Sequence, residues 1–349
     1  METERLTDSK PTEESRTRQV VAVLGCYRGG TSLLARLLPV IGVPLEGELM
    51  RAGGCNPTGF WENQDILQVN EELAAYLPRR GFSPNLEMAR VQAQPGYPLV
   101  RERALEILKR LFEVSPVVGF KHPATSRLLP FWQGVFEEVQ AGAAYLIAVR
   151  DPGATAESLR VNFHLRIEAG LLLWLEHLMR ALQFTQARPR VIVSYERMLE
   201  APPEQIARIV EAFGKTQQID NTTIDWYAQR FVDRRLQHAA GGSRQTRRLL
   251  TDFPLVGELD GLLRARADDA IDELGFMDAA QSLIARFDRE LPAIRLRYPC
   301  LADAERSRIS RAGVLYFRLR HEGVRSTLRR LQERLEARLV RVGDRRRNY

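Results

Sequence analysis

The sequence predicts an α/β fold: a three-layer sandwich with a central parallel sheet, followed by a helical C-terminal extension. Short apolar, β-branched runs alternate with longer segments of helical periodicity, as expected for a parallel sheet covered by helices on both faces. Hydrophobic residues make up 44% and charged residues 27% of the 349 residues, which is ordinary for a globular chain with an ample core.

Four segments have the composition of buried strands, and the short stretch near Val43–Pro44 is expected to be a fifth. The strands are predicted at 20–25, 117–121, 144–149 and 190–194, and the helices at 31–39, 64–77, 101–113, 165–186 and 203–213. The segment from Gly81 to Tyr97 holds four Pro or Gly residues and few aliphatic ones, so we expect a loop there.

The chain is expected to divide into a disordered tail at 1–18, one α/β domain at 19–260 and a helical extension at 261–349. The basic excess is confined to the extension, where residues 304–349 hold 14 Arg and five acidic residues. Apolar residues at three- and four-residue steps predict an Arg-rich amphipathic helix at 324–342. It would pack on the domain or on a second subunit; the alternative is contact with an anionic membrane surface.

The N-terminal segment is polar and has no apolar core of the kind found in signal peptides, and no uncharged run reaches 18 residues. The three cysteines lack the spacing of metal ligands and suggest a reducing compartment. We therefore expect a cytoplasmic protein, membrane-associated only through 324–342, and no metal site.

Residues 20–32, VVAVLGCYRGGTS, form the most informative segment of the chain. A β-branched run, a glycine-rich loop and an apolar helix follow one another, which is the setting of a phosphate-binding P-loop. The usual lysine after Gly30 is replaced by Thr31, and Arg28 lies inside the loop instead. Loop amides and the helix N-terminus would still bind an anion, but the lysine that reaches the β- and γ-phosphates of ATP is missing.

A second segment, residues 143–160, is an apolar strand that ends in Arg150 and passes into a helix bearing Ser158. The guanidinium group offers a planar fork of donors to phosphate oxygens, and the hydroxyl group adds a neutral donor. Taken alone, the segment also fits an Arg-Asp pair followed by the Asp-Pro start of a helix.

Together the two segments resemble the cofactor-binding segments of sulfotransferases, which use 3′-phosphoadenosine 5′-phosphosulfate (PAPS) and release 3′-phosphoadenosine 5′-phosphate (PAP). Arg28-Gly29-Gly30-Thr31-Ser32 resembles the 5′-phosphosulfate loop of that family, and Arg150 and Ser158, eight residues apart, resemble its 3′-phosphate site. The resemblance implies a P-loop NTPase-like sulfotransferase fold.

Three further segments resemble the family in the same order along the chain, so the resemblance spans about residues 20–245. They are GCNPTGFWENQDILQVNEEL at 54–73, VVGFKHP at 117–123 and VIVSYERMLEAPPEQIARIVEAFG at 191–214. The last segment contributes Tyr195 to the implied cofactor site. Arg244, in a basic glycine-rich loop, is a candidate donor to the 3′-phosphate, with a solvated surface loop as the alternative.

The resemblance also implies catalytic residues. Lys121, one of only four lysines, would stabilise the charge that develops on the leaving group. Glu62 occupies the place of the glutamate base in carbohydrate-type sulfotransferases, while cytosolic sulfotransferases use a histidine, for which His122 is the candidate. We favour Glu62, because neighbours on a strand such as Lys121 and His122 point to opposite faces. The acceptor would be a hydroxyl or amine of a small molecule, saccharide or glycolipid.

Two other classes of protein are alternatives to a sulfotransferase. A P-loop nucleotide kinase or phosphotransferase would need a loop lysine and an acidic strand end for Mg²⁺, whereas these strands end in Lys121 and Arg150. A non-catalytic protein with a PAPS-binding fold would act through its basic C-terminal helix on a membrane. Nucleic acid is not an expected partner, because the basic tail has few interleaved aromatic residues.

Overall fold

The structure is a computed structural model that describes residues 17–50, 52, 59–76, 84–186, 188–213, 221–231 and 251–298. Arg244, the predicted helix at 324–342 and most of the predicted N-terminal tail lie outside the described residues. Within the described ranges, every helix is too short or too polar to span a lipid bilayer.

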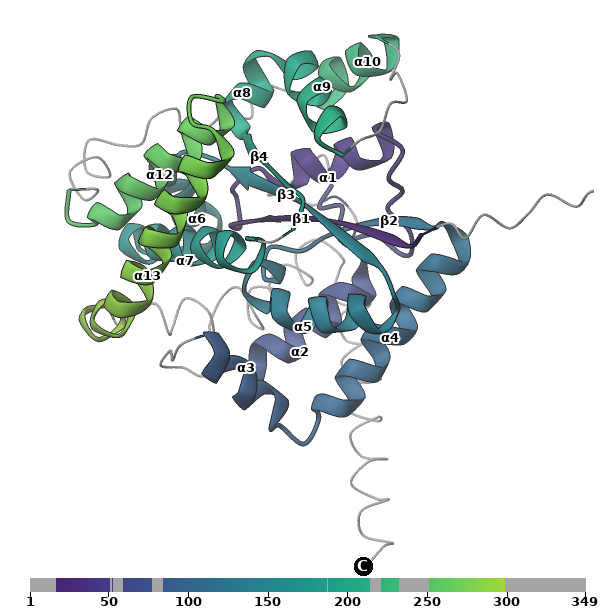
Figure 1. Cartoon of the computed structure of the whole chain (residues 1–349), viewed down its shortest axis with the longest axis horizontal. Coiled ribbons are helices and arrows are strands. Elements are labelled where there is room, and N and C mark those ends of the chain that lie inside the picture. Colours follow the sequence, from purple (N-terminus) through teal and green to yellow (C-terminus); the bar gives the residue numbers. More distant parts are fainter. Residues whose placement is uncertain are drawn as a thin grey trace, which may run out of the picture.

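The described sheet has four strands, all parallel, in the order β2-β1-β3-β4 (Figure 1). The strands are β1 (Gln19–Gly25), β2 (Val117–Lys121), β3 (Gly142–Val149) and β4 (Arg190–Ser194). Side chains alternate between two separate cores: Val20 and Leu24 of β1 face one, and Val21 faces the other. All four longer predicted strands are confirmed, and so is the predicted fold class.

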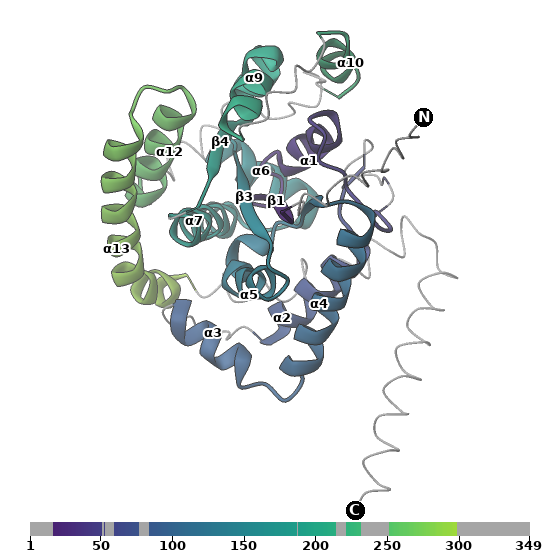
Figure 2. The ribbon, with the colours of Figure 1, turned by 45° about the vertical axis from the view of Figure 1, so that its right-hand side comes forward.

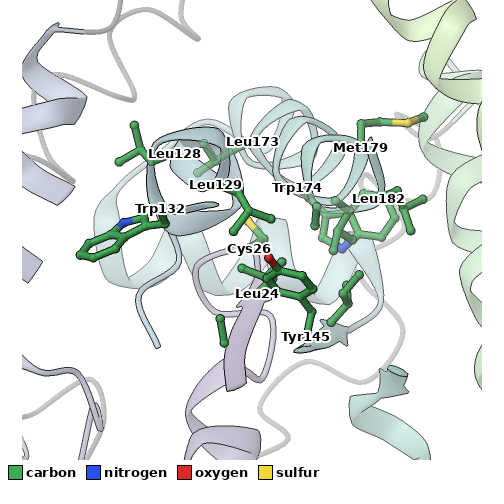
Figure 3. Packing of buried hydrophobic residues seen from close by; sticks show 14 of the residues in the cluster. Leu24, Cys26, Leu128, Leu129, Trp132, Tyr145, Leu173, Trp174, Met179 and Leu182 are labelled. Carbon is green, nitrogen blue, oxygen red and sulfur yellow. The ribbon is translucent and has the colours of Figure 1, made fainter. Parts of the chain in front are cut away.

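Helices cover both faces of the sheet (Figures 1 and 2). The core on one face contains residues of α1 (Thr31–Val40), α8 (Tyr195–Glu200), α9 (Pro202–Ala212) and α10 (Asn221–Phe231). The larger core contains residues of α2 (Gln64–Tyr76), α3 (Pro84–Gln92), α4 (Tyr97–Val114), α5 (Thr125–Glu138), α6 (Pro152–Phe163), α7 (Ile167–Phe184), α12 (Pro254–Ala267) and α13 (Glu273–Arg297). Leu24, Tyr145 and Trp174 meet in this larger core (Figure 3).

Two predictions of local structure were wrong. Val43–Pro44 is not a strand: the Pro44 carbonyl accepts one hydrogen bond from the amide of Gly119, at 2.9 Å, but proline has no N–H with which to continue a ladder. The expected loop at 81–97 contains α3, which begins at Pro84. Proline is well tolerated in the first turn of a helix, so it starts this helix rather than excluding it.

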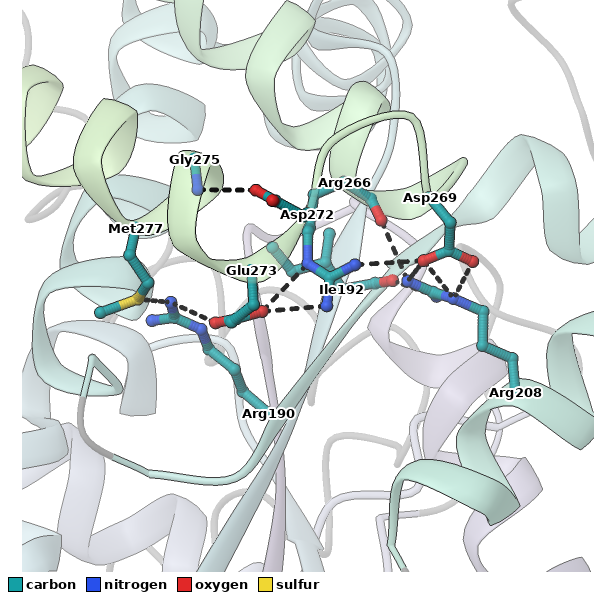
Figure 4. A network of polar contacts seen from close by, with 9 residues as sticks. All are labelled: Arg190, Ile192, Arg208, Arg266, Asp269, Asp272, Glu273, Gly275 and Met277. Atoms are coloured by element: carbon teal, nitrogen blue, oxygen red, sulfur yellow. Dashed lines mark hydrogen bonds and ion pairs between the residues drawn. The ribbon is translucent and has the colours of Figure 1, made fainter.

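β4 is the last strand of the described sheet, and its outer edge is covered by α9, α12 and α13 through a network of arginine side chains (Figure 4). Arg208 donates to the Ile192 carbonyl at 2.7 Å and pairs with Asp269 at 3.0 Å. Arg266 pairs with Asp269 and with Glu273, at 3.1 and 2.9 Å. A cavity of about 320 Å³ lies among these residues, near the amino end of β4. Its arginines are held by acidic groups and carbonyls of the protein itself, so we interpret the network as structural.

A buried ion triad attaches α13 to α5 and α7. The Glu176 carboxylate, 1% exposed, accepts from Arg127 Nε at 3.2 Å and from Arg295 at 2.6 Å through the same oxygen, Oε1. Burial alone would raise the pKa of Glu176, but Arg127, Arg295 and Arg180 together lower it to about 2. The carboxylate is therefore charged at neutral pH and offsets the charge of the surrounding arginines.

We expect Glu176→Gln to destabilise the protein by about 3–5 kcal/mol, because it removes the negative charge that two buried guanidinium groups share. Urea denaturation of the two proteins gives the difference in the free energy of unfolding. The control is Glu258→Gln, which breaks an exposed 2.7 Å pair with Arg286 and should cost less than about 1 kcal/mol. A loss for Glu176→Gln no larger than that of the control would contradict a structural role for the triad.

Candidate functional site

The predicted site residues that are described lie where the four parallel strands end, at one edge of the sheet. In an open α/β sheet this is the edge at which ligands bind. The glycine loop follows β1, Lys121 ends β2, Arg150 follows β3 and Tyr195 follows β4. The cavity described above lies at the opposite end of β4 and does not belong to this site.

The glycine loop between β1 and α1 uses left-handed backbone conformations, with φ of 62° at Arg28 and 90° at Gly30. The amide of Gly29 closes the turn on the Cys26 carbonyl at 3.0 Å. A Cβ at Gly30 would lie 2.7 Å from the ring of Tyr195, so a glycine is required both by the backbone and by this contact. Helix α1 begins at Thr31, and the amides at the very start of an α-helix have no carbonyl one turn earlier to bond to, which makes a helix N-terminus favourable for an anion.

Arg28, Arg150, Ser158 and Tyr195 form one group, which we call the arginine cluster. Arg28 Nε donates to Ser158 Oγ at 3.0 Å, and Arg150 donates to the Arg28 carbonyl at 3.1 Å. The Arg150 guanidinium also lies over the Tyr195 ring, 4.8 Å from its centroid. The structure thus brings together residues from the loop, from the segment that follows β3, from α6 and from the start of α8.

Arg150 is only 7% exposed, and among the described residues no carboxylate pairs with it. The neighbouring Asp151 instead caps α6, accepting from the Ala154 amide at 2.7 Å. A buried cation that is held only by a carbonyl and an aromatic ring is costly without a counter-charge. The arginine cluster therefore has the electrostatic character of an anion site.

Ser32, Glu62, Lys121 and His122 form the second group, the lysine cluster. The Lys121 ammonium donates to Glu62 Oε1 at 2.5 Å, to the Phe60 carbonyl at 3.1 Å and to Ser32 Oγ at 3.2 Å. Lys121 is 2% and Glu62 7% exposed. The segment before Glu62 has positive φ angles, 96° at Gly59 and 59° at Trp61, where the chain turns sharply before α2.

His122 lies closer to Glu62 than the sequence predicts. Alternation along a strand should point it away from Lys121, yet its Nε2 lies 4.0 Å from Glu62 Oε2. The reason is that β2 ends at Lys121, so His122 is outside the strand and does not follow the alternation. Burial lowers the pKa of His122 to about 4, against the opposing effect of Glu62, so the imidazole is neutral at pH 7.

Two residues of the site are missing from the sequence prediction. The Tyr27 ring makes T-shaped contacts with the rings of His122 and His177, with centroids 6.1 and 5.5 Å apart. Asn70 donates to His122 Nδ1 at 3.2 Å. Asn70 lies on the face of α2 that buries Ile66 and Leu73, and a polar residue on an apolar helix face was the signal that could have identified it.

No protein-family model matches the sequence, and no curated protein matches it either. Solved structures with similar chains include a sulfotransferase domain from the curacin biosynthetic pathway and a sulfotransferase domain from the olefin synthase of Synechococcus PCC 7002. The first is 14% identical, covers 69% of this chain and 99% of its own, and has a TM-score of 0.37. The second is 16% identical, covers 68% and 95%, and has a TM-score of 0.35. Both values are too low to support a statement about activity.

We expect His122 to make the free energy of unfolding depend on pH. Its pKa falls from 6.5 to about 4 on folding, so between these values only the unfolded chain binds the proton. The stabilisation is complete above pH 6.5 and is lost as the pH falls toward 4, by about 1.4 kcal/mol per pH unit. Denaturation of the wild type and of His122→Gln at pH 7.5 and 5.0 measures it.

Between these two pH values the wild type should lose about 2 kcal/mol more than His122→Gln. His164→Gln, which removes an exposed histidine, is the control for the loss of a histidine as such. Equal losses in the wild type and in His122→Gln would show that the imidazole titrates normally and is not held in a dry environment.

Proposed function

We propose that this protein is a PAPS-dependent sulfotransferase that moves a sulfuryl group to a hydroxyl or amine of a small-molecule, saccharide or glycolipid acceptor. The observation that carries the proposal is the buried Arg150 guanidinium, which has no carboxylate partner among the described residues. Beside it lie a second cation, Arg28, and the hydroxyl of Ser158. A phosphate dianion would supply the missing counter-charge.

The described residues fit the two charged ends of PAPS. In this assignment the arginine cluster binds the 3′-phosphate through charge-assisted hydrogen bonds, and the loop amides with the start of α1 bind the 5′-phosphosulfate. Arg28 lies between the two sites, with its backbone in the loop and its side chain on Ser158. When bound, PAPS supplies a sulfuryl group already activated by a phosphate leaving group.

The lysine cluster would perform the chemistry. The acceptor oxygen forms a bond to sulfur while the bond from sulfur to the phosphate oxygen breaks, and the acceptor proton passes to the Glu62 carboxylate. Lys121 holds its ammonium between Ser32, at the start of α1, and Glu62, where it stabilises the negative charge of the transition state. The cation and the base are thus held in contact on the same side of the loop.

A nucleotide kinase is the weaker interpretation. Its metal ion would need a free carboxylate at a strand end, whereas Asp151, which follows β3, is engaged with the Ala154 amide and lies 3.5 Å from Arg264. The residues at the ends of β2 and β3 are cationic, which favours an anionic group over a metal ion.

We expect PAP to bind with micromolar affinity and ATP far more weakly, because ATP lacks the 3′-phosphate that the arginine cluster would hold. Arg150→Ala should weaken PAP binding by one to two orders of magnitude, corresponding to about 1.5–3 kcal/mol for a charge-assisted contact. Titration calorimetry measures both effects. Arg160→Ala, which removes an exposed arginine of the same α6 helix, is the control. Equal affinities for PAP and ATP would overturn the proposal.

We also expect Glu62→Gln to lower kcat by about 10²–10⁴, the usual contribution of a positioned base, with little change in PAP affinity. Transfer from radiolabelled PAPS to fractionated glycans, glycolipids and small metabolites first identifies an acceptor. The variants are then compared at saturating PAPS, so that weaker binding is not mistaken for slower chemistry. Glu72→Gln, on the half-exposed side of α2, is the matched control. Near-normal turnover by Glu62→Gln would exclude this residue as the base.

A further inference from the structure

We infer that Asn70 is a positioning residue that fixes His122 as the tautomer with its hydrogen on Nε2, so that His122 acts as a hydrogen-bond donor to the acceptor hydroxyl while Glu62 acts as the base. The catalytic part of this inference rests on the proposed function. The tautomer itself follows from the contacts of Asn70 and can be measured without any substrate.

The orientation of the Asn70 amide is set by Trp132. The indole N–H can only donate, and it lies 2.8 Å from Asn70 Oδ1. The amide NH₂ group must therefore be on the other side, where it lies 3.2 Å from His122 Nδ1 and 3.0 Å from Thr125 Oγ1. Because an amide nitrogen only donates, Nδ1 has to accept, and the hydrogen of the neutral imidazole is left on Nε2.

Solvent water cannot stabilise the opposite orientation of the Asn70 amide, because Asn70, Trp132 and Thr125 are all completely buried. Each hydrogen of the NH₂ group and the carbonyl oxygen already has a partner. Rotating the amide by 180° would place NH₂ against the indole N–H and leave two buried donors facing each other. The low pKa of His122 agrees with this arrangement, since a protonated ring would turn Nδ1–H toward the NH₂ group.

The consequence concerns the space between His122 and Glu62. Lys121 occupies Oε1 of Glu62, while Oε2 lies 4.0 Å from His122 Nε2, too far for a direct hydrogen bond. One oxygen atom can lie about 2.8 Å from both of these atoms. An acceptor hydroxyl at that point would receive a hydrogen bond from Nε2–H and donate its own hydrogen to Oε2. A histidine with its hydrogen on Nε2 cannot take that proton, which leaves it to Glu62.

The tautomer is tested by NMR of protein labelled with ¹⁵N at histidine, without ligand. The chain has five histidines, and the signal that disappears in His122→Gln assigns His122. We expect Nδ1 to resonate as an unprotonated, pyridine-type nitrogen and Nε2 as a protonated, pyrrole-type one. A hydrogen on Nδ1 in the wild type overturns the inference.

Two variants test the cause. Asn70→Asp puts a carboxylate against Nδ1 and should move the hydrogen onto Nδ1, and Trp132→Phe removes the donor that orients the amide and should give a mixture of tautomers. Unchanged spectra in both variants overturn the role of Asn70. If Asn70→Asp does not fold, the spectra of the wild type and of Trp132→Phe still test the inference. We expect Trp132→Phe to fold, because the new phenyl ring can pack against Phe120, Phe131 and Phe136 as the indole does.

Steady-state kinetics of sulfuryl transfer test the catalytic part of the inference independently. Asn70→Asp should lower kcat about tenfold or more and leave the KM for PAPS unchanged, because Asn70 bonds to His122, Thr125 and Trp132 and not to the loop or the arginine cluster. Gln68→Glu makes the same chemical change on the same helix, away from His122, and should keep normal turnover. Normal turnover by Asn70→Asp with a changed tautomer overturns the catalytic role. If the wild type shows the expected tautomer and transfers no sulfuryl group, the proposed function fails and the role of Asn70 in fixing the tautomer stands.

Discussion

The arrangement of the candidate site depends on the hydrogen bonds of the Lys121 ammonium group. It lies at the end of β2 and reaches a side chain of α1, a carbonyl in the segment before α2 and the carboxylate of Glu62. Since the group is almost completely buried, each of these oxygens is needed to replace the water it has lost. One cation therefore fixes the relative positions of three chain segments that are far apart in the sequence.

Buried arginines have two different roles in this protein. Arg127 and Arg295 share the carboxylate of Glu176, so a counter-charge for both lies within the protein. Arg150 has only a carbonyl and an aromatic ring around it among the described residues. The first arrangement holds helices together, whereas the second leaves a buried cation without a carboxylate partner among the described residues. Burial alone does not distinguish them; the presence of a carboxylate partner does.

The sequence could predict the features that depend on local pattern. Apolar runs identify buried strands, and residues that follow such strands in a parallel sheet must lie at one edge, which is why the glycine loop, Lys121 and Arg150 could be placed together. Contacts between distant side chains could not be predicted. The bonds of Asn70 to His122 and Trp132 join α2 to residues more than fifty positions away; the apolar helix face around Asn70 marks it as unusual but does not identify its partners. The direction of His122 was mispredicted because strand alternation stops one residue earlier.

The covering of β4 has a consequence for any shortened form of the chain. β4 is an edge strand of the described sheet, and Arg208, α12 and α13 lie over its open side. A chain that ended before Pro254 would keep every residue of the arginine and lysine clusters but would uncover this strand and part of the larger core. Unpaired strand edges beside apolar surface are templates for association between molecules. By covering this edge, α12 and α13 protect the protein against aggregation, although they contribute no residue to either cluster.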